Sequence, residues 1–373
     1  MAGVEVVPVR RRAEMKAFID LPWEIYRGDP NWVPPLKSEI SRLLDPRKHP
    51  FWKFSERELF LARRGSETVG RIATIIDHNY NRYHNESMGI WGFFESARDP
   101  EAAVALFAAA EAWVRGKGMA FMRGPLNPST NYEVGLLVQG FDSPPALMMT
   151  YNPAYYTELV HYCGHKKEKD LLAYRFALGA EVPDWTFGLA QRFGEMGEIS
   201  VRPVGRRTLE ADLRLMNRVY NECWAKNWGF VPMTDDEIME TSKALVHIGD
   251  TDLAFFLCHK GEPVGVCLII PDVNPLLKRF NGKLGLSALI KKHLYWSEVT
   301  GLRGLLFGVK EEYRQMGLPW VAFDYLFQVL RKGKRYRYIE LGWNLEDNEA
   351  INRLYEEAGL SPHKRYRIYR KDL

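Results

Sequence analysis

Two kinds of hydrophobic pattern alternate along this chain. In some short stretches apolar residues recur at every second position, which is typical of strands, and in longer stretches they recur every three or four positions, which is typical of amphipathic helices. We predict strands at residues 4–9, 59–63, 68–76, 89–94, 120–123 and 169–176, and helices at residues 15–26 and 101–115, with a further short helix before the last strand. This mixture predicts an α/β fold in which helices pack on a mixed sheet.

The second half of the chain repeats this order of elements. Strands are predicted at residues 199–204, 253–258, 263–270, 305–309, 338–343 and 364–369, and helices at residues 209–220 and 319–331. Local residues repeat too: Pro8-Val9 returns as Pro203-Val204, and Tyr174-Arg175 returns as Tyr369-Arg370. Because the matches keep their order, they favour a duplicated domain over coincidental composition. We therefore predict two tandem domains, residues 1–180 and 181–373, with the boundary in the linker-like stretch 177–198.

Composition narrows the class of protein. The chain has 373 residues, of which 46% are hydrophobic and 26% charged, as expected of a soluble globular protein with two domains. Neither a membrane-spanning run nor a signal peptide is recognisable, so we expect a cytoplasmic protein. Its four cysteines lack the spacing of metal ligands, and no metal is expected. A net charge of +4 is too small to indicate nucleic-acid binding, but it suits a polyanionic ligand or an anionic lipid surface.

Two segments near the C-terminus carry candidate chemistry. Residues 309–319 predict a strand, a loop with Gly317 and then a helix, the geometry in which backbone N–H groups can surround a phosphate. Residues 348–360 predict a helix that starts at Asp347 or Asn348 and ends at Gly359. Tyr355 falls on the apolar stripe of this second helix.

In this order, the two segments resemble the cofactor motifs of the GNAT superfamily of acyl-CoA-dependent N-acyltransferases. The family pattern Arg/Gln-x-x-Gly-x-Gly/Ala is here Arg314-x-x-Gly317-x-Pro319, and Pro319 departs from it because proline has no N–H. The resemblance implies that acetyl-CoA or a longer acyl-CoA binds in the second half. The cofactor-binding residues it implies are Val309, Arg314, Gln315, Met316, Gly317, Leu318 and Asn348.

The resemblance also implies catalytic roles. Tyr355 would lie near the thioester sulfur and protonate the leaving thiolate, which a phenol of pKa about 10 can do at hydrogen-bonding distance. The alternative is that Tyr355 only packs in the core. A backbone N–H on the strand ending at Val309 would stabilise the oxyanion. Glu340 is the candidate base, although many such strand positions simply face solvent.

The first half departs from the motifs. Its corresponding turn, within residues 91–100, has no glycine, and Glu95 and Asp99 would repel a pyrophosphate. Val160 stands where the second half has Tyr355. We therefore expect a degenerate first domain. An added segment at residues 124–153 places polar residues beside a Leu/Met-rich run, which suits either an acceptor pocket or a packed loop. Its candidate acceptor-binding residues are Asn127, Ser129, Asn131 and Glu133.

The second half has its own insertion, residues 274–296. Its helically spaced residues are Leu286, Leu289, Ile290, His293 and Leu294, with Lys291 and Lys292 beside them. Such a segment can lie on a membrane, cover an apolar substrate or pack in the core. A peripheral contact with the inner membrane surface is therefore one expectation.

The whole chain resembles a family of bacterial double-GNAT proteins, most clearly at residues 23–34, 45–51, 92–95 and 140–145. Some members are thought to N-acylate long-chain sphingoid bases to ceramide-like lipids. The resemblance implies an N-acyltransferase that uses acyl-CoA and an amine acceptor, for which a sphingoid-type amine is a candidate. An acyl-CoA sensor without catalysis and a transferase that uses aminoacyl-tRNA are the alternatives, although no nucleic-acid partner is expected.

Overall fold

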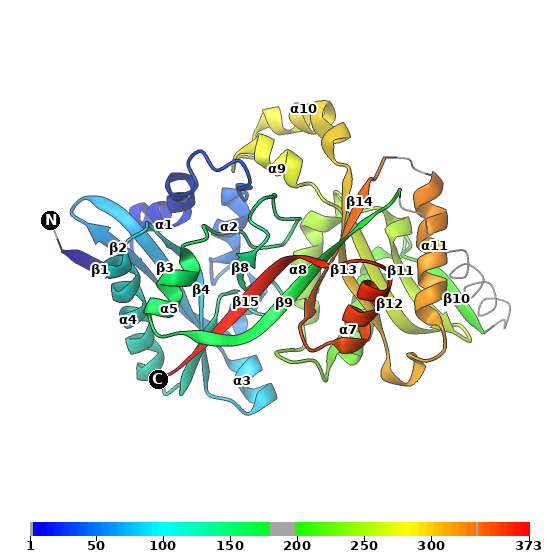
Figure 1. The fold of residues 1–373 in the computed structure, drawn as a ribbon, viewed down its shortest axis with the longest axis horizontal. Coiled ribbons are helices and arrows are strands. Elements are labelled where there is room, and N and C mark those ends of the chain that lie inside the picture. Colours follow the sequence, from blue (N-terminus) through cyan, green and yellow to red (C-terminus); the bar gives the residue numbers. More distant parts are fainter. Residues whose placement is uncertain (1–2, 180–197, 333–334) are drawn as a thin grey trace. The chain divides into compact units, whose positions relative to one another are not determined.

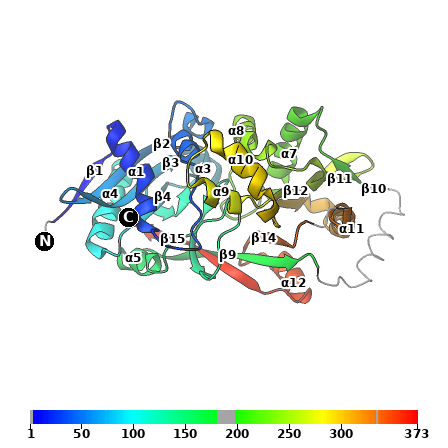
Figure 2. The same cartoon turned by 90° about the horizontal axis from the view of Figure 1, so that it is seen from above.

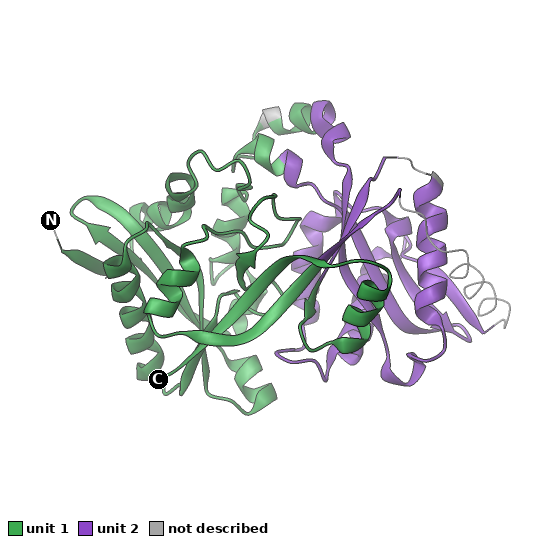
Figure 3. Cartoon of the chain, in the orientation of Figure 1, with its two compact units in different colours: residues 1–173, 277–292, 343–373 green, residues 174–276, 293–342 purple. Residues whose placement is uncertain are grey.

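The computed structural model describes residues 3–179, 198–332 and 335–373 (Figure 1). The chain forms two compact units: unit 1 contains residues 1–173, 277–292 and 343–373, and unit 2 contains residues 174–276 and 293–342 (Figure 3). Most of the predicted boundary stretch, residues 177–198, lies outside the described residues.

A mixed sheet forms the centre of unit 1. Its strands are, in spatial order, β1 (Val4–Pro8), β2 (Ser55–Arg64), β3 (Glu67–Asp77), β4 (Met88–Ser96), β5 (Phe121–Gly124), β15 (Pro362–Asp372) and β9 (Lys166–Ala177). β4 and β5 are parallel, whereas β1–β2, β2–β3, β3–β4 and β5–β15 are antiparallel. A short strand, β8 (Leu136–Gln139), pairs with β15.

Helices cover both faces of this sheet (Figure 2). Ile72 and Ile76 of β3 belong to the same core cluster as Leu106 of α4 (Pro100–Gly116). On the other face, Arg71 donates to the carbonyl oxygen of Phe18 in α1 (Arg12–Ile25). The smaller helices of the unit are α2 (Lys37–Leu43), α3 (His78–His84), α5 (Tyr156–Tyr162) and α12 (Glu349–Glu357), and α9 (Asn274–Phe280) begins in unit 2 and ends in unit 1.

Unit 2 has the same plan. Its strands are, in order, β14 (Tyr338–Leu345), β13 (Gly301–Val309), β12 (Glu262–Pro271), β11 (Ala254–His259) and β10 (Ile199–Pro203). Side chains alternate between the faces of β11: Phe255 clusters with Leu318 of α11 (Leu318–Lys332), and Phe256 clusters with Met216 of α7 (Leu209–Trp224). α8 (Asp235–Val246) packs beside α7, and α10 (Leu286–Tyr295) belongs to the insertion. Helices thus pack on both faces of the strands in each unit, and the predicted α/β fold is confirmed.

The two sequence copies exchange their last strands. In unit 1, β15 from the end of the chain pairs with β5, with Tyr369 opposite Gly124. In unit 2, the end of β9 lies beside β14, where the N–H of Leu178 donates to the carbonyl oxygen of Arg337 at 2.8 Å. The compact units therefore mix segments of both halves, and the boundaries 1–180 and 181–373, which concern the sequence copies, stay a prediction.

Candidate functional site

The predicted phosphate loop joins β13 to α11 in unit 2. β13 ends at the buried Val309, a short 3₁₀ turn (Glu311–Tyr313) follows, and α11 begins at Leu318. Gly317 has φ +75°, a left-handed conformation that glycine adopts without strain. Pro319 stands in the first turn of α11, where N–H groups have no intrahelical acceptor, so the helix tolerates the missing donor.

This loop presents free backbone donors. Among the described residues, no acceptor is found for the N–H groups of Gln315, Gly317 and Leu318, whereas the N–H of Met316 donates to the carbonyl oxygen of Tyr313 at 3.1 Å. Unsatisfied N–H groups at the positive end of a helix dipole favour a bound anion. The loop therefore has the local geometry and polarity that a phosphate requires.

The side chain of Arg314 holds the backbone of the loop by two hydrogen bonds. Its Nε donates to the carbonyl oxygen of Val309 at 3.2 Å, and its Nη2 donates to that of Cys223 at 3.3 Å. The side chain of Arg314 thus ties the loop to the end of β13 and to α7. Its first effect is to hold the loop backbone in place.

The strand before the loop separates from its neighbour. β13 and β14 pair from Gly301 opposite Tyr338 to Gly304 opposite Leu341, and the pairing stops there although both strands continue. On the other side of β13, the register with β12 skips Leu305. A skipped residue in a ladder is left unpaired and can direct its N–H elsewhere. This is the stretch in which the sequence predicts an oxyanion donor.

Glu340 lies in a buried cluster of charged groups, not in solvent. Its side chain is fully buried, and the Nε of Arg175 lies 3.1 Å from its carboxylate. Arg303, also buried, is its register partner on β13. Burial and the nearby Asp272 carboxylate raise the pKa of Tyr338 to about 12. The solvent-facing alternative for Glu340 is therefore wrong, because the strand position is covered and its charge is paired. The role of Glu340 as a base stays a prediction.

The second motif forms in unit 1. α12 begins after Asn348, which occupies the N-cap position without a side-chain cap hydrogen bond. Tyr355 is buried on this helix, and its carbonyl oxygen accepts from the N–H of Leu360 at 2.9 Å. Gly359 has φ +79°, as a glycine after a helix C-terminus often has. Asn348 and Tyr355 thus belong to unit 1, whereas the loop and Glu340 belong to unit 2.

In the first copy, the ladder between the corresponding strands also stops, but the chain occupies the space beyond it. β4 and β5 pair up to Ile90 opposite Arg123, and the chain that follows β5 stays against β4. A Cβ on Gly92 would lie 2.0 Å from the carbonyl oxygen of Leu126, and one on Gly124 would lie 2.2 Å from that of Trp91. The chain itself therefore fills the place between these strands.

The backbone N–H groups at the corresponding positions of the first copy already have acceptors. The N–H of Phe93 donates to Oδ1 of Asn127 at 2.7 Å. At the start of α4, Asp99 accepts from the N–H of Ala102 at 3.2 Å and pairs with Arg64 at 2.8 Å. Glu95 accepts from the hydroxyl of Tyr156 at 2.7 Å. Carboxylates thus occupy the positions where a phosphate would need donors.

The candidate acceptor residues lie on a hairpin of unit 1. Asn127 of β6 (Leu126–Asn127) stands opposite Glu133 of β7 (Glu133–Val134), and the hydroxyl oxygen of Ser129 accepts from the N–H of Asn131 at 3.3 Å. Glu133 differs from the other three, because its carboxylate has no hydrogen bond or ion pair with any described residue. Burial raises its pKa to about 7. An unpaired carboxyl group that ionises near neutral pH can bind an ammonium group or accept a proton.

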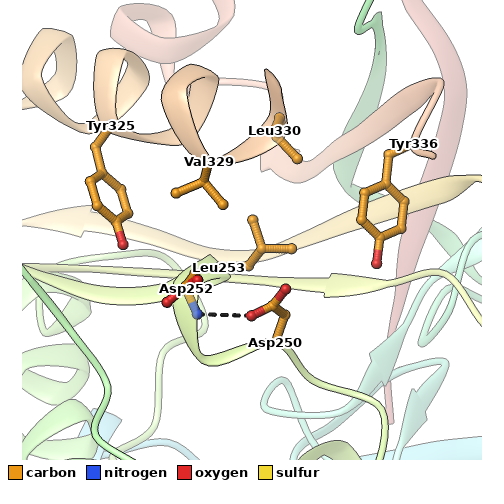
Figure 4. Close-up of a pocket in the computed structure, with 7 residues that line it drawn as sticks. All are labelled: Asp250, Asp252, Leu253, Tyr325, Val329, Leu330 and Tyr336. Atoms are coloured by element: carbon orange, nitrogen blue, oxygen red, sulfur yellow. Dashed lines mark hydrogen bonds between the residues drawn. The ribbon is translucent and has the colours of Figure 1, made fainter. Parts of the chain in front are cut away.

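A cavity of about 400 Å³ lies elsewhere in unit 2 (Figure 4). It is bounded by the second half of α11 and the turn before β11, and its lining residues are Asp250, Asp252, Leu253, Tyr325, Val329, Leu330 and Tyr336. Val329 and Leu330 are more than ten residues beyond Gly317 on a helix that rises about 1.5 Å per residue. The cavity is therefore separate from the phosphate loop.

Comparisons with known proteins agree with this geometry. The bacterial ceramide synthase of Caulobacter vibrioides is 35% identical to the chain over 100% of its length and 98% of the relative's, and the protein YghO of Escherichia coli K12 is 30% identical over 96% and 93%. No family model matches the chain.

Solved structures share the fold over nearly the whole chain. A tandem GNAT protein from the clavulanic acid biosynthesis pathway superposes with a TM-score of 0.56 at 13% identity, and covers 99% of this chain and 98% of its own. A GCN5-related N-acetyltransferase from Sphaerobacter thermophilus gives 0.53 at 14% identity. The chain thus has the tandem GNAT fold that its sequence predicts, and it belongs to the GNAT-type N-acyltransferase family that includes the bacterial ceramide synthase.

Proposed function

We propose that this protein transfers an acyl group from acyl-CoA to the amino group of a long-chain, sphingoid-type base. The observation that carries the proposal is the contrast between the two copies. The second copy has a glycine loop whose N–H groups lack acceptors among the described residues, whereas in the first copy the corresponding N–H groups donate to the side chains of Asn127 and Asp99. The full-length relative named bacterial ceramide synthase supports the choice of acceptor.

The second copy supplies the acyl-CoA site in this proposal. The N–H groups of Gln315, Gly317 and Leu318 bind the pyrophosphate, and Arg314 holds the loop in place. Val309 and Met316 flank the coenzyme where β13 ends, and Asn348 contacts it from the start of α12. The N–H of Leu305, which the β12 register skips, stabilises the oxyanion.

Proton transfer completes the reaction. The neutral amine forms a C–N bond with the acyl carbon while the C–S bond breaks, so the nitrogen must lose a proton and the thiolate must gain one. Tyr355 donates the proton to the thiolate, and a carboxylate accepts the proton from nitrogen. Glu340 and Glu133 are the candidates for the second role: Arg175 holds the Glu340 carboxylate as an ion pair, whereas the pKa of Glu133 is raised to about 7.

The first copy serves the acceptor. Glu133 attracts the ammonium form of the amine, and Asn127, Ser129 and Asn131 shape the hairpin that carries it. Leu136 and Leu137, which follow the hairpin, are buried and provide an apolar wall. The proposal includes a cytoplasmic location, where acyl-CoA is available.

Mass spectrometry tests this function. We expect that the protein incubated with palmitoyl-CoA and sphinganine forms the N-acyl amide and free CoA, and that short hydrophilic amines react much more slowly. If short amines are acylated at equal rates, the proposed long-chain acceptor is wrong, but the protein is still an acyltransferase. If acyl-CoA binds but no amine is acylated, the protein is a sensor and the proposal fails.

A further inference from the structure

Half of the large apolar side chains that are exposed on the described residues lie in one segment. Eight large apolar residues are exposed among those that the structure describes, and four of them lie between positions 284 and 294. They are Leu284, Leu289, Ile290 and Leu294, which are 58%, 76%, 63% and 63% exposed. Single exposed apolar residues are ordinary, but a contiguous group marks an interaction surface.

The helix α10, which carries three of these four residues, turns its large apolar side chains outward. Leu289, Ile290 and Leu294 lie on one side at helical spacing and are exposed, whereas Ala288 is 5% exposed and faces inward. A helix on a globular protein normally turns its large apolar side chains to the core. The predicted stripe therefore exists, but the core-packing alternative is wrong for these three residues. α10 is drawn in yellow in Figure 1.

The segment before α10 is anchored. Nε1 of Trp23 donates to Oδ1 of Asn281 at 2.8 Å, and the N–H of Lys37 donates to the carbonyl oxygen of Gly282 at 3.1 Å. Gly282 has φ +80°, and a Cβ there would lie 2.3 Å from the Trp23 ring. These contacts, all within unit 1, fix the turn that leads from α9 towards α10.

The charge within the segment itself is of one sign. Residues 273–297 contain no acidic residue and five basic ones, Lys278, Arg279, Lys283, Lys291 and Lys292, in a chain whose net charge is only +4. Lys291 and Lys292 flank the stripe and are half-buried, and Nζ of Lys291 donates to the carbonyl oxygen of Arg279 at 2.9 Å. Apolar side chains bordered by lysines match a bilayer surface whose headgroups are anionic.

We propose that α10 and the turn before it dock on an anionic bilayer surface. Leu284, Leu289, Ile290 and Leu294 insert at the level of the headgroups, and the exposed Lys283 contacts lipid phosphates. The biological purpose of this binding rests on the proposed function, because a long-chain acceptor would be dissolved in the membrane. The binding itself does not depend on acyl transfer.

Co-sedimentation of the full-length protein with vesicles tests the proposal. We expect binding to vesicles of phosphatidylglycerol and phosphatidylcholine in equal parts, much weaker binding to phosphatidylcholine alone, and weakening by salt. Leu289→Ser with Ile290→Ser should lower the partition coefficient at least tenfold. Lys283→Gln should lower it about fivefold, because each basic residue near an anionic surface contributes about that factor.

The matched control is Val104→Ser with Val246→Ser, two exposed aliphatic residues outside the segment, which are 42% and 44% exposed. This variant should bind vesicles as the wild type does, and both double variants should keep the wild-type melting temperature and CoA affinity. Equal vesicle binding by the Leu289/Ile290 variant would overturn the proposal. So would a wild-type dimer that this variant converts to a monomer without any change in vesicle binding, because the face would then join two copies of the chain.

Discussion

At the scale of single residues, Glu133 offers the clearest pH signature. Burial raises the pKa of this carboxyl group to about 7, so it loses its charge as the pH falls through neutrality. If Glu133 receives the amine proton, kcat/KM should fall about tenfold for each pH unit below 7. We expect Glu133→Gln to lower kcat/KM roughly 10²–10⁴-fold and to remove this acidic limb.

Glu133→Asp is the control for this prediction, because it keeps a carboxyl group and should retain a shifted acidic limb. CoA affinity should be equal in the wild type and both variants. If the Glu133→Gln variant has the wild-type rate and pH profile, Glu133 takes no part in proton transfer.

Tyr355 should act on the chemical step and not on binding. The residue is buried on α12, so replacing it with phenylalanine keeps the ring in place and removes only the hydroxyl. We expect Tyr355→Phe to lower kcat roughly 10²–10⁴-fold and to change the Kd for CoA less than threefold, because a proton donor acts in the transition state. Steady-state kinetics beside calorimetry separates the two effects, and an unchanged kcat would make Tyr355 a packing residue.

At the scale of elements, the start of α11 predicts a variant that binds CoA more tightly. Pro319 offers no N–H in a first helical turn where the N–H of Leu318 has no acceptor among the described residues and that of Trp320 donates to the carbonyl oxygen of Gly317 at 3.0 Å. Pro319→Ala adds one donor near the bound phosphate, and a hydrogen bond to a charged group contributes about 1.5–3 kcal/mol. We expect the Kd for CoA to fall about tenfold, at a small cost in melting temperature from the lost proline. A weaker affinity would show that the phosphate does not sit against this turn.

The elements also show how far a sequence can predict this structure. The helix predicted at residues 101–115 is α4 (Pro100–Gly116), and the strand at residues 263–270 is β12 (Glu262–Pro271). Such elements follow from local periodicity and glycine turns. The pattern of α10 predicts a stripe but not whether protein covers it, and alternation along β14 cannot show that Arg175 pairs with Glu340.

The exchange of last strands could not be predicted for a related reason. β9 and β15 carry the same pattern, as the repeated Tyr-Arg pairs at residues 174–175 and 369–370 show, so either strand fits either sheet. The sequence predicts Glu133 as a candidate acceptor-binding residue, but the lack of a partner for its carboxylate among the described residues depends on the folded hairpin.

At the scale of the whole molecule, this exchange makes the two halves dependent on each other. Residues 1–180 lack β15, which lies between β5 and β9 in the sheet of unit 1. A sheet that loses an inner strand leaves two rows of backbone groups unpaired. We expect residues 1–180 expressed alone to be insoluble or unfolded, and the same fragment co-expressed with residues 181–373 to form a soluble complex. Circular dichroism and size-exclusion chromatography would check this, and a stable fragment 1–180 would contradict it.

Calorimetric titration of the full-length protein with CoA tests the central claim, that the chain has one acyl-CoA site and that the second copy holds it. Gln315→Glu adds a negative charge on the exposed loop, and Arg98→Gln makes the same change of charge in the corresponding exposed turn of the first copy. We predict one CoA bound per chain, at least tenfold weaker binding in Gln315→Glu and unchanged binding in Arg98→Gln. Two molecules of CoA per chain, or a loss of affinity in Arg98→Gln and not in Gln315→Glu, would contradict the account.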